Sequence, residues 1–247
     1  MLRFFPPTAT PLLSSRLYTA GELIVGSLVL LGMGSVLPML MANTLNWGLA
    51  FGVYALISLL MMVFWSGGAL GWANRITLLR AILIALAAGA LANNVFTQAI
   101  WLWLVIATVA LMLDGVDGWI ARLTKSYSAF GARFDMELDA LLILLLCIGL
   151  IQLESLGLWI LLIGLMRYFF VAASWHFTWL CAPLFASFRR KLVCVWQVSA
   201  LLLALTPLTH PFLASLLAFS ALVSLAYSFG VDIRWLYRQS GHKHTRT

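Results

Sequence analysis

Carboxylate side chains gather in one stretch of this sequence, residues 114–139. The chain has only eight Asp and Glu residues, and five of them fall in this stretch: Asp114, Asp117, Asp135, Glu137 and Asp139. Long apolar runs lie on both sides, where a carboxylate is costly unless it is paired or bound to a metal. Scarce acids clustered in such surroundings indicate a functional site.

The spacing of four of these acids predicts that they face one another across a pair of helices. Asp114 and Asp117 are three residues apart, and Asp135 and Asp139 are four apart, so each pair shares one face of a helix. A short polar connection at 123–130 allows the two helices to run antiparallel. Facing carboxylates repel one another unless cations lie among them, and hard oxygen ligands suit Mg²⁺ or Mn²⁺. The stretch therefore predicts a divalent metal site.

Small residues share the helix faces of the carboxylates. Gly118 and Ala121 follow Asp114 at helical spacing, and Gly131 lies one turn before Asp135. Such small residues let a bulky ligand approach the backbone closely. Together with Arg122, they complete the pattern D-x-x-D-G-x-x-A-R, eight residues, G-x-x-x-D-x-x-x-D. This pattern resembles the signature of the CDP-alcohol phosphatidyltransferase family, and every fixed position is matched.

The resemblance implies a reaction and a set of site residues. Family members transfer a phosphatidyl or similar phospho-lipid group from a CDP-linked donor to an alcohol and release CMP. The four aspartates would hold two Mg²⁺ or Mn²⁺ ions, and Asp139 would also be the general base for the acceptor hydroxyl. A second, weaker match is N-x-x-T-x-x-R, ending at Arg80. The residues implied in binding the CDP portion are Gly118, Ala121, Arg122, Gly131, Asn74 and Thr77.

Composition predicts an integral membrane protein. Apolar residues make up 63% of the chain and charged residues 9%, and the mean hydropathy is +1.02. Eight apolar runs are each near the ~20 residues that cross a bilayer. They are residues 21–43, 47–66, 76–93, 97–121, 132–152, 156–180, 191–209 and 211–233.

Loop charges predict the orientation of these runs. Connections between the runs that carry Lys or Arg alternate with connections that carry neither. Arg75 and Arg80, which follow the second run, are included among the basic connections. The positive-inside rule then places both termini and the aspartates on the cytoplasmic side of the inner membrane. The net charge of +7 is explained by these loops, so nucleic acid is not an expected partner.

The resemblance covers roughly residues 72–234, which implies a six-helix core. Residues 1–71 are expected to form a short polar N-terminal segment and two extra transmembrane helices. The expected role of these two helices is lateral packing or dimerisation. Residues 235–247 form a polar cytoplasmic tail. The expected fold is therefore an all-α membrane protein of eight helices. Its expected partners are a lipid donor like CDP-diacylglycerol, a small alcohol acceptor and the surrounding lipids.

Basic residues outside the signature are candidates for binding the acceptor. A phosphorylated acceptor needs fixed cations near the metal site, because an anion must approach an anionic donor. This favours a phosphorylated polyol, of which glycerol 3-phosphate is the commonest in the family. The alternatives are a topological role for most of these residues and pairing with a site carboxylate for Arg167. The candidates are Arg133, Arg167, Arg189, Arg190 and Lys191.

Two functions of other classes compete with transfer. An ion or metal transporter would use intramembrane carboxylates spread along a path to the far side, whereas these gather at one end. A member without activity, acting as a scaffold, would have no need of an intact signature. Both features favour the transferase.

Overall fold

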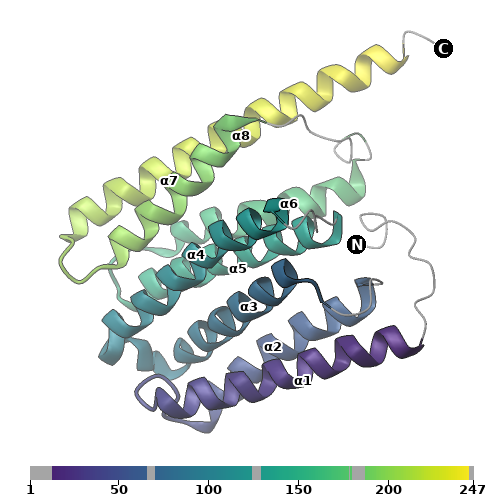
Figure 1. Ribbon diagram of the computed structural model, residues 1–247. Helices are drawn as coiled ribbons and strands as arrows, with labels where there is room; N and C mark the ends of the chain where they lie inside the picture. Colours follow the sequence, from purple (N-terminus) through teal and green to yellow (C-terminus); the bar gives the residue numbers. More distant parts are fainter. Residues whose placement is uncertain (1–12, 66–69, 124–128, 178, 180–186, 245–247) are drawn as a thin grey trace. The chain divides into compact units, whose positions relative to one another are not determined.

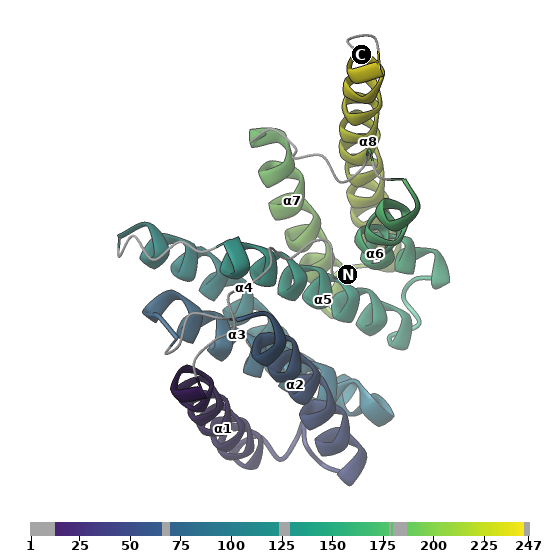
Figure 2. The ribbon, with the colours of Figure 1, turned by 90° about the vertical axis from the view of Figure 1, so that its right-hand side faces the viewer.

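The computed structural model describes residues 13–65, 70–123, 129–177, 179 and 187–244 (Figure 1; Figure 2). These residues form eight α-helices, two short 3₁₀ segments at Ala92–Ala99 and Leu158–Ile160, and no strand. The prediction of an all-α chain with eight helices is confirmed. The α-helices are α1 Leu13–Val36, α2 Thr44–Phe64, α3 Trp72–Ala90, α4 Ile100–Leu123, α5 Ala129–Gln152, α6 Leu161–His176, α7 Phe188–Leu205 and α8 Pro211–His244.

Several helix ends differ from the expected ones. The largest difference is in α8, which has 34 residues and includes most of the expected polar tail. Polar residues such as Arg and Gln are good helix formers, so loss of hydrophobicity at 235 does not by itself end a helix. At ~1.5 Å per residue α8 is about 50 Å long, more than the ~30 Å apolar thickness of a bilayer. Helix α8 is therefore long enough for one end to project beyond the bilayer into water.

The chain divides into two compact units, residues 1–145 and 146–247, with the boundary inside α5. In the first unit α3 is the central helix, because it contacts α1, α2 and α4 (Figure 1). Its side chains from Ala81 to Ala88 are all buried. A helix that is apolar all round belongs in an interior. Polar groups carried by α3 are thus brought inside the unit.

Glycines bring α1 and α2 close together. A Cβ on Gly26 would lie 2.1 Å from the Tyr54 hydroxyl oxygen, and one on Gly34 would lie 2.5 Å from the Trp47 ring. The Tyr54 hydroxyl donates a hydrogen bond of 2.8 Å to the Leu23 carbonyl. Close approach through small residues is a common way for helices to associate in membranes. The two N-terminal helices form a packed pair.

The second unit contains α6, α7 and α8. Helices α7 and α8 pack against each other, and α8 also contacts α6. An edge-on contact between Phe170 and Phe229, with ring centroids 5.5 Å apart, joins α6 to α8. The turn between α7 and α8 is short, and Thr209 closes it by donating to the Leu203 carbonyl at 2.7 Å.

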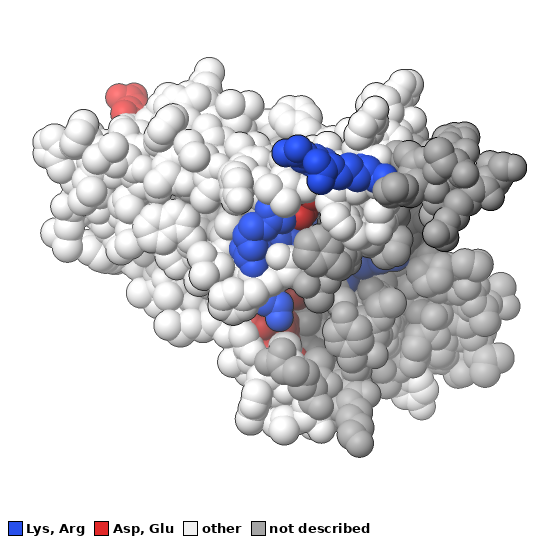
Figure 3. Space-filling model, turned by 90° about the horizontal axis from the view of Figure 1, so that it is seen from above, with Lys and Arg blue, Asp and Glu red and all other residues white. Residues whose placement is uncertain are grey.

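Within the described ranges, four segments are long and apolar enough to cross a membrane. They are Arg16–Val36, Thr44–Phe64, Phe96–Ile120 and Pro211–Gln239. Among the described residues on the face shown in Figure 3, few side chains are charged. These features fit an integral membrane protein. An eight-span arrangement with a six-helix core stays a prediction.

Candidate active site

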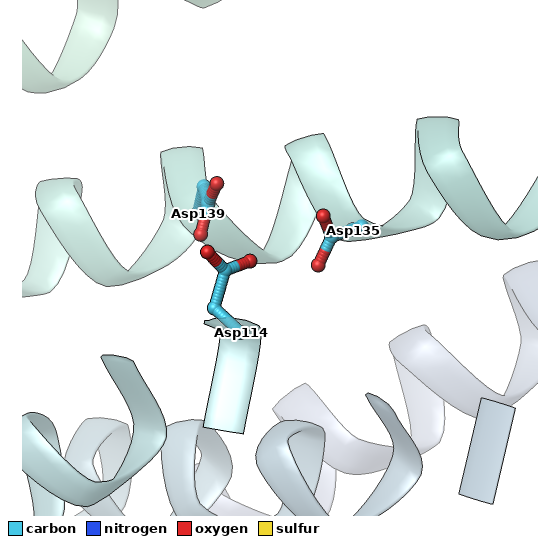
Figure 4. Close-up of side chains that lie close together, drawn as sticks. All are labelled: Asp114, Asp135 and Asp139. Atoms are coloured by element: carbon cyan, nitrogen blue, oxygen red, sulfur yellow. The ribbon is translucent and has the colours of Figure 1, made fainter. Parts of the chain in front are cut away.

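The aspartates of the signature come from the C-terminal half of α4 and the N-terminal half of α5. Asp114 and Asp117 lie on α4, and Asp135 and Asp139 on α5. One carboxylate oxygen from each of Asp114, Asp135 and Asp139 lies within 4.8 Å of the other two. Figure 4 shows Asp114 directed toward the face of α5 that carries Asp135 and Asp139. The prediction that acids on two helices face one another is thus met by these three residues.

Asp117 lies at the edge of this group and has a different partner. Its side chain is buried, and its Oδ2 accepts a hydrogen bond of 3.0 Å from the Thr77 hydroxyl of α3. The three closest acids keep between a fifth and a third of their side-chain surface exposed. A ligand can therefore reach Asp114, Asp135 and Asp139 more readily than Asp117.

Arg80 of α3 lies among the four carboxylates and has no exposed surface. Its Nη1 donates to Asp114 Oδ1 at 2.8 Å and also to Asp135 Oδ1. Its Nη2 donates to Asp139 Oδ1, and its Nη1 lies 4.0 Å from Asp117 Oδ2. A guanidinium is always charged and offers a rigid fork of donors, so it can hold several carboxylates at once.

Sequence reasoning missed this role for Arg80. The residue counts toward the cytoplasmic loop charges, yet the structure buries it in the first unit. The sequence did contain an indication of it. An arginine inside an apolar helix needs an acidic partner, and most acids of this chain lie at 114–139. Its place three residues after Thr77 sets both side chains on one face of α3.

The group contains more carboxylates than cations. Fully ionised, its four carboxylates and one guanidinium would carry a net charge of −3. Clustered carboxylates of this kind are stable when cations join them. The donor set of three close carboxylates fits a hard divalent cation such as Mg²⁺ or Mn²⁺.

The residues expected to contact the CDP portion are only partly described. Asn74 and Thr77 are buried on α3, Gly118 is half-buried on α4, and Gly131 is half-buried on α5. The backbones of Ala121 and Arg122 belong to α4, whereas their side chains lie outside the described residues. Thr77 is tied to the aspartates through its bond to Asp117. Contact of all six residues with CDP stays a prediction.

The basic candidates for acceptor binding divide between the two units. Arg133 is half-buried on α5, two residues before Asp135, and so belongs to the unit that holds the aspartates. Arg167 lies on α6, and residues 189–191 form the start of α7 in the second unit. The role of all five in binding an acceptor stays a prediction.

An acid that sequence reasoning did not pair lies beside the cluster at 189–191. Asp232 of α8 is buried and accepts a hydrogen bond of 2.5 Å from Arg189 Nη2. Arg190 Nη1 lies 3.7 Å from the other oxygen of Asp232. These contacts show that Arg189 and Arg190 help to join α7 to α8. Any anion bound there would compete with the Asp232 carboxylate.

Comparison with known proteins identifies a family. The model of the CDP-alcohol phosphatidyltransferase family matches residues 70–230, which include α3, α4, the four aspartates and Arg80. The chain belongs to this family. No curated protein and no solved structure shows significant similarity to it. Family membership makes the chain a transferase of phosphate-linked groups from CDP-alcohols and sets aside the transporter alternative.

Proposed function

We propose that this protein transfers a phosphatidyl group from a lipid donor such as CDP-diacylglycerol to an alcohol, with release of CMP. The observation that carries the proposal is the group of three carboxylates within 4.8 Å of one another, supplied by two helices of the matched region. The aspartates lie toward the C-terminal end of the apolar helix α4 and toward the N-terminal end of α5. A donor with a lipid part and a nucleotide part would need both apolar and polar surroundings at such a site. The product would be a membrane phospholipid.

The reaction balances without any oxidant or reductant. The acceptor oxygen forms a bond to the phosphorus on the lipid side of the diphosphate. The bond from that phosphorus to the bridging oxygen breaks, and CMP leaves with the electron pair. The proton of the acceptor hydroxyl passes to a carboxylate, for which Asp139 is the candidate. Asp114, Asp117, Asp135 and Asp139 would hold Mg²⁺ or Mn²⁺, which would offset negative charge on the diphosphate.

Arg80 has a distinct part in this proposal. Its charge-assisted hydrogen bonds to Asp114 and Asp139 fix one carboxylate of α4 relative to one of α5. Thr77 fixes Asp117 in the same way. These contacts place the carboxylates before any substrate arrives, which lowers the reorganisation needed during the reaction.

The test is a transfer assay on purified protein in lipid nanodiscs. CDP-diacylglycerol is supplied with Mg²⁺ or Mn²⁺ and one alcohol at a time: glycerol 3-phosphate, an inositol phosphate, serine or choline. CMP release and the lipid product are both measured, and Asp135→Asn is the matched inactive control. We expect CMP to appear with at least one acceptor and to disappear in EDTA. CMP release that is unchanged in EDTA, or no CMP with any acceptor, would overturn the proposal.

A further inference from the structure

The two N-terminal helices make polar contacts with both ends of α3. Helices α1 and α2 precede the matched region, which begins at residue 70. Helix α3 is the first helix of that region and carries Asn74, Thr77 and Arg80. Both N-terminal helices pack on it. Contacts of α1 and α2 with α3 can therefore affect the positions of the α3 residues next to the aspartates.

Glu22 of α1 binds the segment where α3 begins. Its Oε2 accepts a hydrogen bond of 2.7 Å from the Leu70 amide. Its Oε1 accepts from Arg75 Nε at 3.0 Å and from Arg75 Nη2 at 2.6 Å. Trp72 covers the Arg75 guanidinium, which lies 5.1 Å from the ring centroid. The Glu22 carboxylate thus binds the Leu70 amide just before the helix and the Arg75 side chain in its first turn.

The start of α3 has no capping side chain of its own. Its N-cap residue is Gly71, which has no side chain for capping, and no acid occurs in the first turn of this helix. The first amides of a helix lack partners within the helix, and a negative charge is favourable there. Glu22 brings a carboxylate from another helix to this start, where it binds the amide one residue before the N-cap and the Arg75 side chain in the first turn.

Asn46 of α2 binds the opposite end of α3. Its side chain is fully buried, and its Nδ2 donates to the Gly89 carbonyl at 2.8 Å and the Ala92 carbonyl at 2.9 Å. Its Oδ1 accepts from the Asn43 amide at 3.2 Å. The last carbonyls of a helix also lack partners within it. Thr77 and Gly89 are twelve residues apart, about 18 Å along the helix, so this contact is far from the aspartates.

We propose that Glu22 is a positioning residue for donor binding, supplied by a helix outside the matched region. By fixing residues 70–75, it sets the position of Asn74 and Thr77, the α3 residues assigned to the CDP portion. Asn46 fixes the far end of α3 and serves stability rather than donor binding. This inference rests on the proposed function for its kinetic part only.

The first experiment measures amide hydrogen exchange in the full-length protein in nanodiscs. We expect Glu22→Ala to speed exchange in the segment that spans residues 70–75, and Glu22→Gln to do so less, because Gln keeps an acceptor for the Leu70 amide. Arg75→Gln tests the same contact while α1 keeps its native sequence. Glu154→Gln is the matched control, since it removes one exposed acid outside the first unit. Unchanged exchange in Glu22→Ala would overturn the positioning role.

The second experiment measures steady-state kinetics for the same variants. We expect Glu22→Ala to raise the donor KM about three- to tenfold, with kcat and acceptor KM close to wild type. Glu22→Asp, which keeps the charge, should recover much of the loss. Asn46→Ser should lower the melting temperature and leave the donor KM unchanged. A fall in kcat alone in Glu22→Ala would mean a structural role and would overturn the inference.

The two experiments separate the inference from the proposed function. If the wild type releases no CMP with any acceptor, the proposed function is wrong, and the exchange data still decide whether Glu22 holds the start of α3. If the wild type is active and exchange rises without a change in donor KM, the proposed function stands. In that case the positioning role of Glu22 is wrong.

Discussion

Arg80 and Asp139 are in direct contact, although they come from α3 and α5 and are 59 residues apart in the sequence. The same guanidinium also reaches Asp114 on α4. One buried cation therefore joins three helices at the point where the signature places its acids. Its charge stabilises the carboxylates, and its position is also one that a divalent cation would favour.

Replacement of Arg80 by Gln should separate these two effects. Without the guanidinium the carboxylates repel one another more strongly, and loss of one partner of a buried ion pair destabilises a protein by about 3–5 kcal/mol. We expect a lower melting temperature, a loss of most transfer activity and a larger rise in melting temperature on addition of Mn²⁺ than in the wild type. Arg80→Lys keeps the charge without the forked donor geometry. Its melting temperature, activity and response to Mn²⁺ should lie between those of the wild type and Arg80→Gln.

The matched control for this prediction is Arg234→Gln, which removes an exposed arginine from α8. It should change neither the melting temperature nor its response to Mn²⁺. An equal response to Mn²⁺ in wild type and Arg80→Gln would show that the guanidinium and the metal do not share the carboxylates.

Neutralising a single aspartate should remove transfer activity while leaving the helices folded. We expect Asp114→Asn, Asp117→Asn and Asp135→Asn each to lower kcat about a hundredfold or more, because an amide binds a divalent cation poorly. Asp139→Asn should lower kcat as much and spare donor binding, measured by calorimetry with CDP-diacylglycerol in nanodiscs. Circular dichroism checks the fold.

Glu137→Gln is the control that α5 itself provides. Glu137 lies two residues from both Asp135 and Asp139, so it is on the opposite side of the helix and its side chain is exposed. Its variant removes the same charge from the same helix and should keep wild-type activity. Full activity in any of the four Asp→Asn variants would contradict the assignment of metal ligands.

The sequence predicted the helical fold and the group of acids because both depend on local patterns. Apolar runs of about 20 residues define helices, and the spacing of Asp114, Asp135 and Asp139 defines the faces that carry them. Helix ends were less predictable, as α8 shows. A helix continues through polar residues that favour it, so the end of an apolar run is not the end of a helix.

Contacts between distant residues were the part that the sequence did not reveal. Arg80, Glu22 and Asn46 are single polar residues within or beside apolar helices, and these partners lie 34 to 59 positions away in the sequence. A lone charge in an apolar helix signals that a partner exists without naming it. Which partner is used depends on how the helices pack, and local residue spacing in the sequence does not reveal this.

Cysteine labelling should establish the topology. With the native cysteines replaced, single cysteines at Lys125 and Arg190 should react with a membrane-impermeant maleimide only from the cytoplasm. Those at Asn94 and Thr209 should react only from outside, because basic loops stay on the cytoplasmic side. Reaction of the Lys125 and Asn94 positions from the same side would contradict the eight-span arrangement.

Gly89→Ala should destabilise the protein even though Ala favours a helix by about 1 kcal/mol relative to Gly. The added Cβ would lie 2.7 Å from the Asn46 carbonyl oxygen and 2.8 Å from the Ala50 Cβ, so α2 and α3 must move apart. Overpacking of this kind costs about 1–3 kcal/mol. Thermal unfolding in nanodiscs measures the effect. Gly52→Ala on α2, where a Cβ meets nothing within 4 Å, is the control and should be neutral or stabilising.

Arginines on two different helices are the candidates for binding a phosphorylated acceptor. If the acceptor carries a phosphate, Arg133→Gln and Arg189→Gln should each raise the acceptor KM steeply, with the donor KM little changed. The effect should be present with glycerol 3-phosphate and absent with serine, because a neutral acceptor gains little from a fixed cation. Steady-state kinetics with both acceptors measure it.

Asp232 provides an independent check on Arg189. Because Asp232 accepts a hydrogen bond from Arg189 and lies 3.7 Å from Arg190, it competes with any anion for both guanidinium groups. Asp232→Asn should therefore lower the KM for a phosphorylated acceptor if these arginines bind it. Arg238→Gln, on the exposed side of α8, should leave every KM unchanged. If Arg133→Gln, Arg189→Gln and Asp232→Asn all leave the acceptor KM unchanged, these arginines serve helix packing and topology, and the preference for a phosphorylated polyol fails with them.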